Sequence, residues 1–91
     1  MADTFLFELL TPEALLLRDR VEEVEVPGKE GYFGVLPLHT YFATTLKPGS
    51  LTVRIGGKSR YYEVSGGVVQ VTPERVVVCA EKAELARLTH D

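Results

Sequence analysis

Apolar and polar residues alternate along much of this chain, in short runs that turn residues separate. In 51–55, leucine, valine and isoleucine alternate with threonine and arginine, so a strand there has one buried and one solvated face. Gly56-Gly57 follows and suits the tight turn of a β-hairpin. The run 58–64 then supplies the second strand of that hairpin. The pattern therefore predicts two antiparallel strands in the middle of the chain.

Further strands are predicted on both sides of this hairpin. The segments 64–72 and 75–80 are rich in β-branched residues, which favour strands, and Pro73-Glu74 between them is typical of a turn. In 21–26 valines alternate with glutamates, and 5–8 begins with a similar alternation. Short strands with turn signals about 8–12 residues apart indicate a β-sandwich or barrel.

Two segments favour a helix when periodicity and propensity alone are considered. Thr11 followed by Pro12 is a good helix start, and apolar residues then recur at helical spacing up to position 24. This pattern predicts a helix over 12–26. The tail 81–88 also has helical propensity, and its conformation stays open between a helical turn and a strand.

Composition places the chain among soluble globular domains and excludes several classes of partner. Its 91 residues are 45% hydrophobic and 25% charged, enough for one domain with one core over 1–91. The net charge of −3 argues against nucleic acid and against anionic lipid surfaces. The start has no signal-peptide pattern, and no apolar run approaches the length of a membrane span. We therefore expect a cytoplasmic domain.

The sequence offers little support for catalysis or metal binding. A set of Asp19, His39 and Ser65 contains the residue types of a nucleophilic triad, but such types co-occur easily. One cysteine and two histidines give no zinc-ligand spacing, and no phosphate-binding glycine motif is present. Cys79 lies in a valine run, which predicts a small buried hydrophobic side chain. We expect no catalytic residue, cofactor or metal.

Two glycine-containing segments are better candidates for binding a partner. Val26–Pro37 carries glycines at 28, 31 and 34 between two prolines, together with Tyr32 and Phe33, and His39 follows. Glycine at this density allows positive φ and close backbone approach, so this loop is expected to be a shaped surface. Ser65-Gly66-Gly67 is either a bend where two backbones approach or a flat patch for a partner.

The segment Val26–Pro37, followed by His39, resembles the signature of the epsilon subunit of the rotary F-type ATP synthase. Four further blocks resemble the family in the same order: 8–13, 46–51, 64–71 and 76–81. The resemblance covers nearly the whole chain. The chain departs from the family at Leu38, where glycine or asparagine is common, and at Tyr32, where an acidic residue often stands.

The resemblance implies a fold that overrides the helix expectation. It implies an all-β domain, a flattened antiparallel β-sandwich of about ten short strands, with strands at 14–18 and 21–26 in place of the helix. The family usually continues with a two-helix hairpin, and its nucleotide-binding motif is absent here. We therefore expect a single domain over 1–91 without a C-terminal helical domain, and neither helical inhibition nor ATP sensing.

The implied function is that of a non-catalytic rotor subunit. Such a subunit links the gamma subunit to the membrane c-ring at the foot of the central stalk, and so couples proton translocation to ATP synthesis. It contacts the catalytic head indirectly and reaches the membrane only through the complex, on the cytoplasmic face. The expected c-ring contacts are Lys29, Glu30, Gly31, Tyr32, Phe33, Gly34 and His39. The expected gamma contacts are Tyr41, Phe42, Ser65, Gly66 and Gly67.

Two other functions remain open at this point. One is a small enzyme that uses His39, and the other is a generic β-sandwich adaptor for an unrelated protein.

Overall fold

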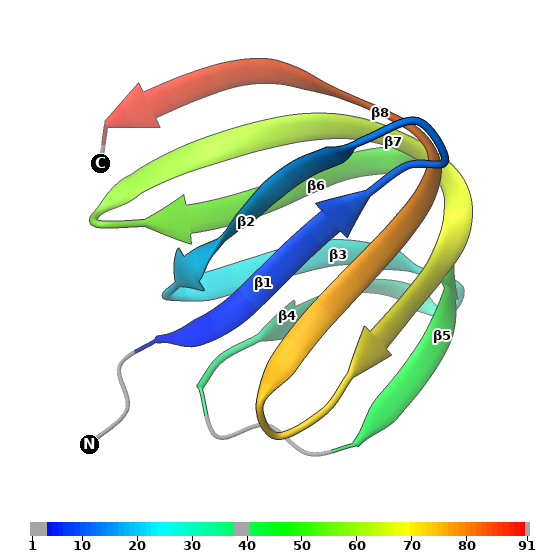
Figure 1. Ribbon diagram of the computed structural model, residues 1–91, viewed down its shortest axis with the longest axis horizontal. Helices are drawn as coiled ribbons and strands as arrows, with labels where there is room; N and C mark the ends of the chain where they lie inside the picture. The colour runs from blue at the N-terminus through cyan, green and yellow to red at the C-terminus, as the bar shows by residue number, and fades with distance from the viewer. Residues whose placement is uncertain (1–3, 38–40, 91) are drawn as a thin grey trace.

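The structure, a computed structural model, describes residues 4–37 and 41–90. His39 and Leu38 lie outside these residues. The described chain forms strands and turns (Figure 1). The strands are β1 (Phe5–Leu10), β2 (Leu15–Val21), β3 (Glu23–Gly28), β4 (Gly31–Val35), β5 (Phe42–Leu46), β6 (Gly49–Ile55), β7 (Lys58–Val71) and β8 (Arg75–His90).

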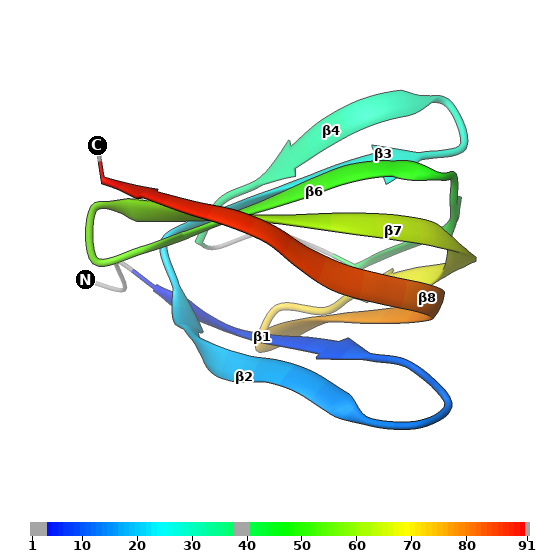
Figure 2. The same ribbon diagram turned by 90° about the horizontal axis from the view of Figure 1, so that it is seen from above.

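The strands form a sandwich of two layers, which Figure 2 shows from above. Strands β2 and β1, the first half of β8, the second half of β7, and β5 form one layer. Strands β4, β3 and β6, the first half of β7 and the second half of β8 form the other. The all-β sandwich prediction is confirmed. The described residues form eight strands and not ten, because β7 and β8 each pass through both layers.

The bend that carries β7 from one layer to the other lies at the predicted Ser65-Gly66-Gly67 segment. Gly66 and Gly67 have φ of 42° and 131°, values that side-chain-bearing residues rarely adopt. A Cβ on Gly67 would overlap the carbonyl oxygen of Cys79 and lie 2.9 Å from the Cα of Ala80. The expectation of a bend with close backbones is therefore the one that the structure supports.

The core fills the space between the layers with side chains from alternating strand positions. In β1, Phe5, Phe7 and Leu9 point inward and are buried. The same alternation in 75–80 buries Val76, Val78 and Ala80. The remaining buried apolar residues are Leu17, Val21, Val24, Val26, Val35, Leu46, Leu51, Val53, Tyr62, Val64, Val69 and Val71.

The helix expected over 12–26 is wrong, and the strands implied by the resemblance are present with shifted bounds. The chain runs as β2 and β3 and breaks at Glu22, whose amide donates to the carbonyl of Arg54 at 2.8 Å. The Glu22 carboxylate accepts the amide of Gly57 at 3.2 Å. Pairing with neighbouring strands thus outweighs local helix propensity. The tail is also a strand, since β8 extends to His90.

Both predicted hairpin turns are present. Gly56 and Gly57 have φ of 58° and 77°, which fits a two-residue turn between β6 and β7. Pro73-Glu74 joins β7 and β8, which pair antiparallel over their whole length. The expected strands 58–64 and 64–72 are one continuous strand, because the bend at Gly66 does not interrupt the pairing with β8.

One strand pair departs from the antiparallel arrangement. Strands β1 and β8 pair in parallel, from Leu6 with Arg75 to Leu10 with Cys79. Glu8 on β1 forms ion pairs with Arg18 on β2 at 3.1 Å and with Arg75 on β8 at 3.3 Å. A nearly buried carboxylate thus links three neighbouring strands. No helix that could cross a membrane occurs among residues 4–37 and 41–90.

Candidate partner-binding surfaces

The glycine-containing segment forms the hairpin of β3 and β4, and its tip is exposed. The two strands pair from Val24 with Val35 to Gly28 with Gly31. Gly31 has a φ of 127°, so the turn requires a residue without a side chain at that position. Lys29 and Glu30 are exposed at the tip. The predicted shaped segment is therefore a hairpin whose tip is exposed to solvent.

On its inner side, the hairpin is supported by aromatic packing. The ring of Phe33 covers Gly28, where a Cβ would lie 2.6 Å from a ring carbon. Phe33 also meets Phe42 of β5 edge to face, with ring centroids 5.3 Å apart and planes at 79°. Phe33 and Phe42 were expected in two separate interfaces, but the structure places them in contact. The two expected surfaces therefore adjoin at this corner.

On its outer side, the hairpin is held by Tyr32. Its hydroxyl oxygen accepts a hydrogen bond from the amide of Ser50 at 3.1 Å, although 56% of the residue is exposed. Gly34 is exposed as well, and a Cβ there would meet only a carboxylate oxygen of Glu23, at 3.6 Å. A small side chain at Gly34 can therefore be added without moving the backbone.

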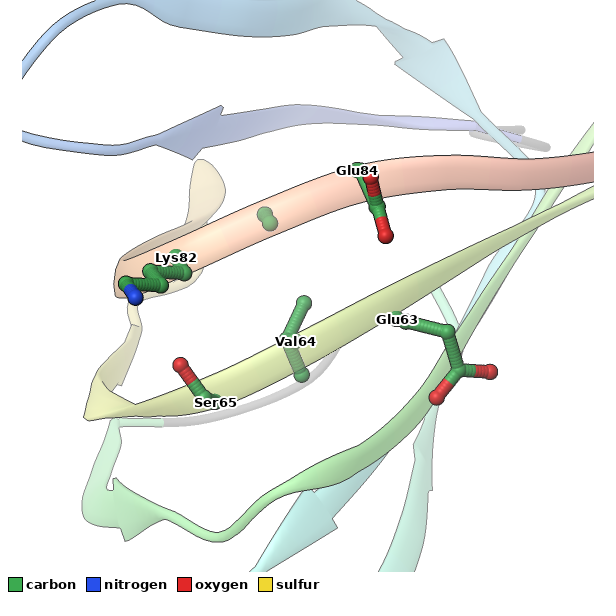
Figure 3. A pocket seen from close by; sticks show the side chains of 6 residues that line it. Glu63, Val64, Ser65, Lys82 and Glu84 are labelled. Atoms are coloured by element: carbon green, nitrogen blue, oxygen red, sulfur yellow. The ribbon is translucent and has the colours of Figure 1, made fainter.

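The bend at Ser65–Gly67 lies beside a shallow hollow of about 440 Å³. Figure 3 shows Lys82 and Glu84 of β8 beside Ser65 and Glu63 of β7 at this hollow. Glu63 and Glu84 are directly opposite in the strand register. Like charges at such positions repel each other, and Lys82 supplies a positive charge at the same hollow.

The sequence interpretation missed an apolar row on the outer face of the layer that contains β1. Four apolar side chains and one threonine lie next to one another in the strand register across five strands: Leu15, Leu10, Cys79, Val68 and, at the end, Thr45. We call them the Val68 row. Val68 is 52% exposed and Leu15 is 49% exposed. Alternation around the inward-facing Val76 and Val78 would have placed their neighbours on this outer face.

The expectation that Cys79 is buried is wrong. Cys79 is exposed, because the alternation of β8 turns Val78 and Ala80 inward. A valine-rich run suggested burial on both faces, which is typical of a central strand in a parallel sheet. In this sandwich only one face of each strand is covered by the other layer.

The structure does not show together the three residues that have the types of a nucleophilic triad, a set that the sequence did not favour. Asp19 lies on the edge strand β2, where its carboxylate accepts the amide of Arg20 at 2.7 Å. Ser65 lies at the bend of β7, and His39 is outside the described residues. Within 4–37 and 41–90, no group of three metal-binding side chains occurs.

These features define a class of protein, a β-sandwich domain with a protruding hairpin and an exposed apolar row on one sheet face. Residues 4–86 match the family model of the ATP synthase delta/epsilon chain, β-sandwich domain. The chain belongs to this family.

Two relatives support this assignment. The ATP synthase epsilon chain of Koribacter versatilis is 40% identical over 84 residues, which are 92% of this chain and 59% of the relative. That of Nitratidesulfovibrio vulgaris is 46% identical over 79 residues, 87% of this chain and 59% of the relative. This chain therefore spans about three fifths of the length of these relatives.

Two solved ATP synthase structures contain a similar fold. A chain in the Euglena gracilis mitochondrial ATP synthase, solved with OSCP, F1 and c-ring, has a TM-score of 0.87 and 28% identity. The match covers 93% of this chain and 55% of that one. A chain in the central stalk and c-ring of the Tetrahymena thermophila enzyme has a TM-score of 0.72 and 15% identity, covering 88% and 65%. The second likeness concerns the fold alone.

Proposed function

We propose that this chain is a non-catalytic subunit of the central stalk of an F-type ATP synthase. The observation that carries the proposal is the match of residues 4–86 to the delta/epsilon family. The similar chain in the Euglena structure belongs to an assembly that includes a c-ring. In this role the domain, acting as one unit over 1–91, joins the gamma subunit to the c-ring, so that proton-driven rotation of the ring turns gamma.

The hairpin of β3 and β4 is the proposed contact with the c-ring. Its tip and exposed strand supply Lys29, Glu30, Gly31, Tyr32, Phe33 and Gly34, and His39 follows in the sequence. Gly28 and Gly31 let the chain reverse tightly, and the aromatic side chains hold the tip in one direction. A fixed tip transmits torque better than a flexible loop, because close-packed side chains resist deformation.

The proposed gamma contact begins at the bend and extends over the neighbouring sheet. Tyr41, Phe42, Ser65, Gly66 and Gly67 were expected there from the sequence. The Val68 row continues this surface, because Val68 follows Gly67 directly and pairs with Cys79. A flat apolar row on a sheet face fits a protein partner, since an isolated sandwich normally presents polar residues on its outer faces.

The role requires no nucleophile, metal or cofactor of the chain's own. Its membrane association runs through the complex, on the cytoplasmic side where the catalytic head stands. The catalytic head is reached only through gamma.

Two substitutions separate the two proposed contacts. Gly34→Val adds a side chain to the exposed face of the hairpin, where only Glu23 is near. Val68→Lys places a charge in the middle of the apolar row, at a position that is 52% exposed. Neither change touches the core, so both variants should remain folded, which cooperative unfolding verifies. We expect Gly34→Val to lose binding to the c-ring and keep gamma, and Val68→Lys to do the reverse.

The measurement is co-purification of each variant with gamma and with detergent-solubilised c-ring from the source organism. If the unaltered chain binds neither component, the proposed function is wrong and an unrelated adaptor role is favoured. If Gly34→Val binds the ring as well as the unaltered chain does, the hairpin is not the contact. If Val68→Lys binds gamma normally, the Val68 row is not part of the interface.

A further inference from the structure

We propose that Tyr32 is a positioning residue that fixes the direction of the hairpin tip, and that Gly49 is glycine in order to admit the Tyr32 hydroxyl. This inference rests on the proposed function, because it concerns the hairpin assigned to the c-ring. It concerns a contact within the chain, which can be tested without any partner.

The contact crosses a whole strand. Tyr32 lies on β4 and is paired with Pro27 of the neighbouring β3. Its hydroxyl reaches past β3 to the start of β6, where it accepts the amide of Ser50 at 3.1 Å. Tyr32 therefore connects β4 with a strand that it does not pair with.

Gly49 is fitted closely to this hydroxyl. A Cβ at Gly49 would lie 2.6 Å from the Tyr32 hydroxyl oxygen and 3.1 Å from the Cβ of Pro27. Gly49 is not among the glycines with positive φ, so its backbone conformation does not require glycine. The requirement is space, and Tyr32 and Gly49 form a matched pair.

The position of β4 explains why this contact matters. Strand β4 pairs only with β3 among the described residues, so it is an edge strand. A backbone hydrogen bond ties β3 to the turn between β5 and β6, since the amide of Lys47 donates to the carbonyl of Pro27 at 2.8 Å. No comparable backbone tie holds β4 on its other edge within the described chain. Side chains must therefore set the angle at which the tip projects.

Two consecutive aromatic residues do this from opposite faces. Successive side chains of a strand point to opposite sides, so Tyr32 lies on the outer face of the hairpin and Phe33 on its inner face. Phe33 packs on Gly28 and Phe42, whereas Tyr32 reaches Gly49 and Ser50. The tip between Gly28 and Gly31 is clamped on both sides. Burial does not explain Tyr32, because 56% of it is exposed.

A double-mutant cycle tests the matched pair. The variants are Tyr32→Phe, Gly49→Ala and the two together, and the free energy of unfolding is measured by denaturant titration. Gly49→Ala alone should lower stability, because its methyl group displaces the Tyr32 hydroxyl from the Ser50 amide. In the Tyr32→Phe background the same change should cost much less. Additive effects of the two substitutions would overturn the matched pair, because contacting residues are expected to be non-additive.

Binding tests the positioning role. Loss of one hydrogen bond that holds the tip should weaken binding to detergent-solubilised c-ring by about two- to twelvefold. Binding of Tyr32→Phe to gamma should not change. The matched control is Tyr61→Phe, which removes a hydroxyl from the same layer and keeps the ring that Arg87 covers at 4.5 Å. This control should bind the ring normally.

The outcomes separate this inference from the proposed function. If the unaltered chain binds neither gamma nor the c-ring, the proposed function fails, and the cycle still decides whether Tyr32 and Gly49 are coupled. If it binds gamma and not the ring, the hairpin is not the ring contact and the positioning role is wrong. If the unaltered chain binds the ring and Tyr32→Phe binds it equally well, the positioning role is wrong and the proposed function stands.

Discussion

Replacing Gly67 with alanine should destabilise this fold more than replacing a glycine of the β6–β7 turn with alanine. Gly67 has a φ of 131°, which costs an alanine about 1–3 kcal/mol in strain. The new methyl group would also overlap the Cys79 carbonyl and lie 2.9 Å from the Cα of Ala80. Forcing backbone apart in a packed region costs about 1–3 kcal/mol more. We therefore expect a loss of about 4 kcal/mol in the free energy of unfolding.

The control is Gly57→Ala in the turn between β6 and β7. Gly57 has a φ of 77°, but a Cβ there meets no atom within 4 Å. Only the left-handed conformation is penalised, at about 1 kcal/mol. In a domain of this size, 1 kcal/mol lowers the melting temperature by about 4–8 °C. The melting temperature of Gly57→Ala should drop by an amount within that interval, and that of Gly67→Ala should drop by about 16–32 °C.

Thermal unfolding followed by circular dichroism measures both shifts, and denaturant titration gives the free energies. Equal losses for the two variants would refute the reasoning, because they would show that the close approach of β7 and β8 adds nothing. A Gly67→Ala chain too unstable to melt cooperatively would agree with it, provided that Gly57→Ala folds.

Two further predictions follow from single side chains. Cys79 is exposed, so it should react with a thiol reagent in the folded chain at a rate near that of a free thiol. It should be protected from the reagent when gamma is bound. Slow reaction of the isolated chain would contradict its exposure. Glu8→Gln removes two partly exposed ion pairs, so it should lower the free energy of unfolding by about 1 kcal/mol at low salt. The loss should be smaller at high salt, because salt screens the ion pairs. A loss that does not depend on salt would indicate a packing effect instead.

Alternation within the strands made much of this fold predictable. Valines and glutamates in 21–26 separated an inner from an outer face, and Val24 and Val26 are fully buried while Glu23 and Glu25 are exposed. Glycine pairs and proline marked the hairpin turns, because their conformational limits are local. Local rules of this kind hold wherever the neighbouring strands do not interfere.

Other features depend on contacts between distant segments and were not predictable from local pattern. Leu17, Val21 and Val24 have helical spacing, yet they lie on two strands because β1 and β6 supply partners for the backbone. Likewise, nothing in the sequence near Ser65 shows that β7 continues through its bend. That continuity arises because β8 bends together with it.

The candidate surfaces were predictable only in part. The density of glycine and aromatic residues in 26–37 singled out the hairpin that the structure displays. The contact between Phe33 and Phe42 could not be foreseen, because it joins separate strands. Similarly, the Val68 row appears only when the register of five strands is known. Surfaces made of one segment can thus be found in a sequence, and surfaces assembled from many strands cannot.

The parallel pairing of β1 with β8 has a consequence for how this chain reaches its native state. The first and last described strands are neighbours, so a layer of the sandwich cannot close until β8 has been synthesised. Pairing between residues so far apart in sequence is slow, because the intervening chain must be ordered first. During translation one backbone edge of β1 therefore lacks its partner strand until β8 emerges. The short length of β1 and the charge of Glu8 reduce the tendency of this unpaired strand edge to aggregate during synthesis.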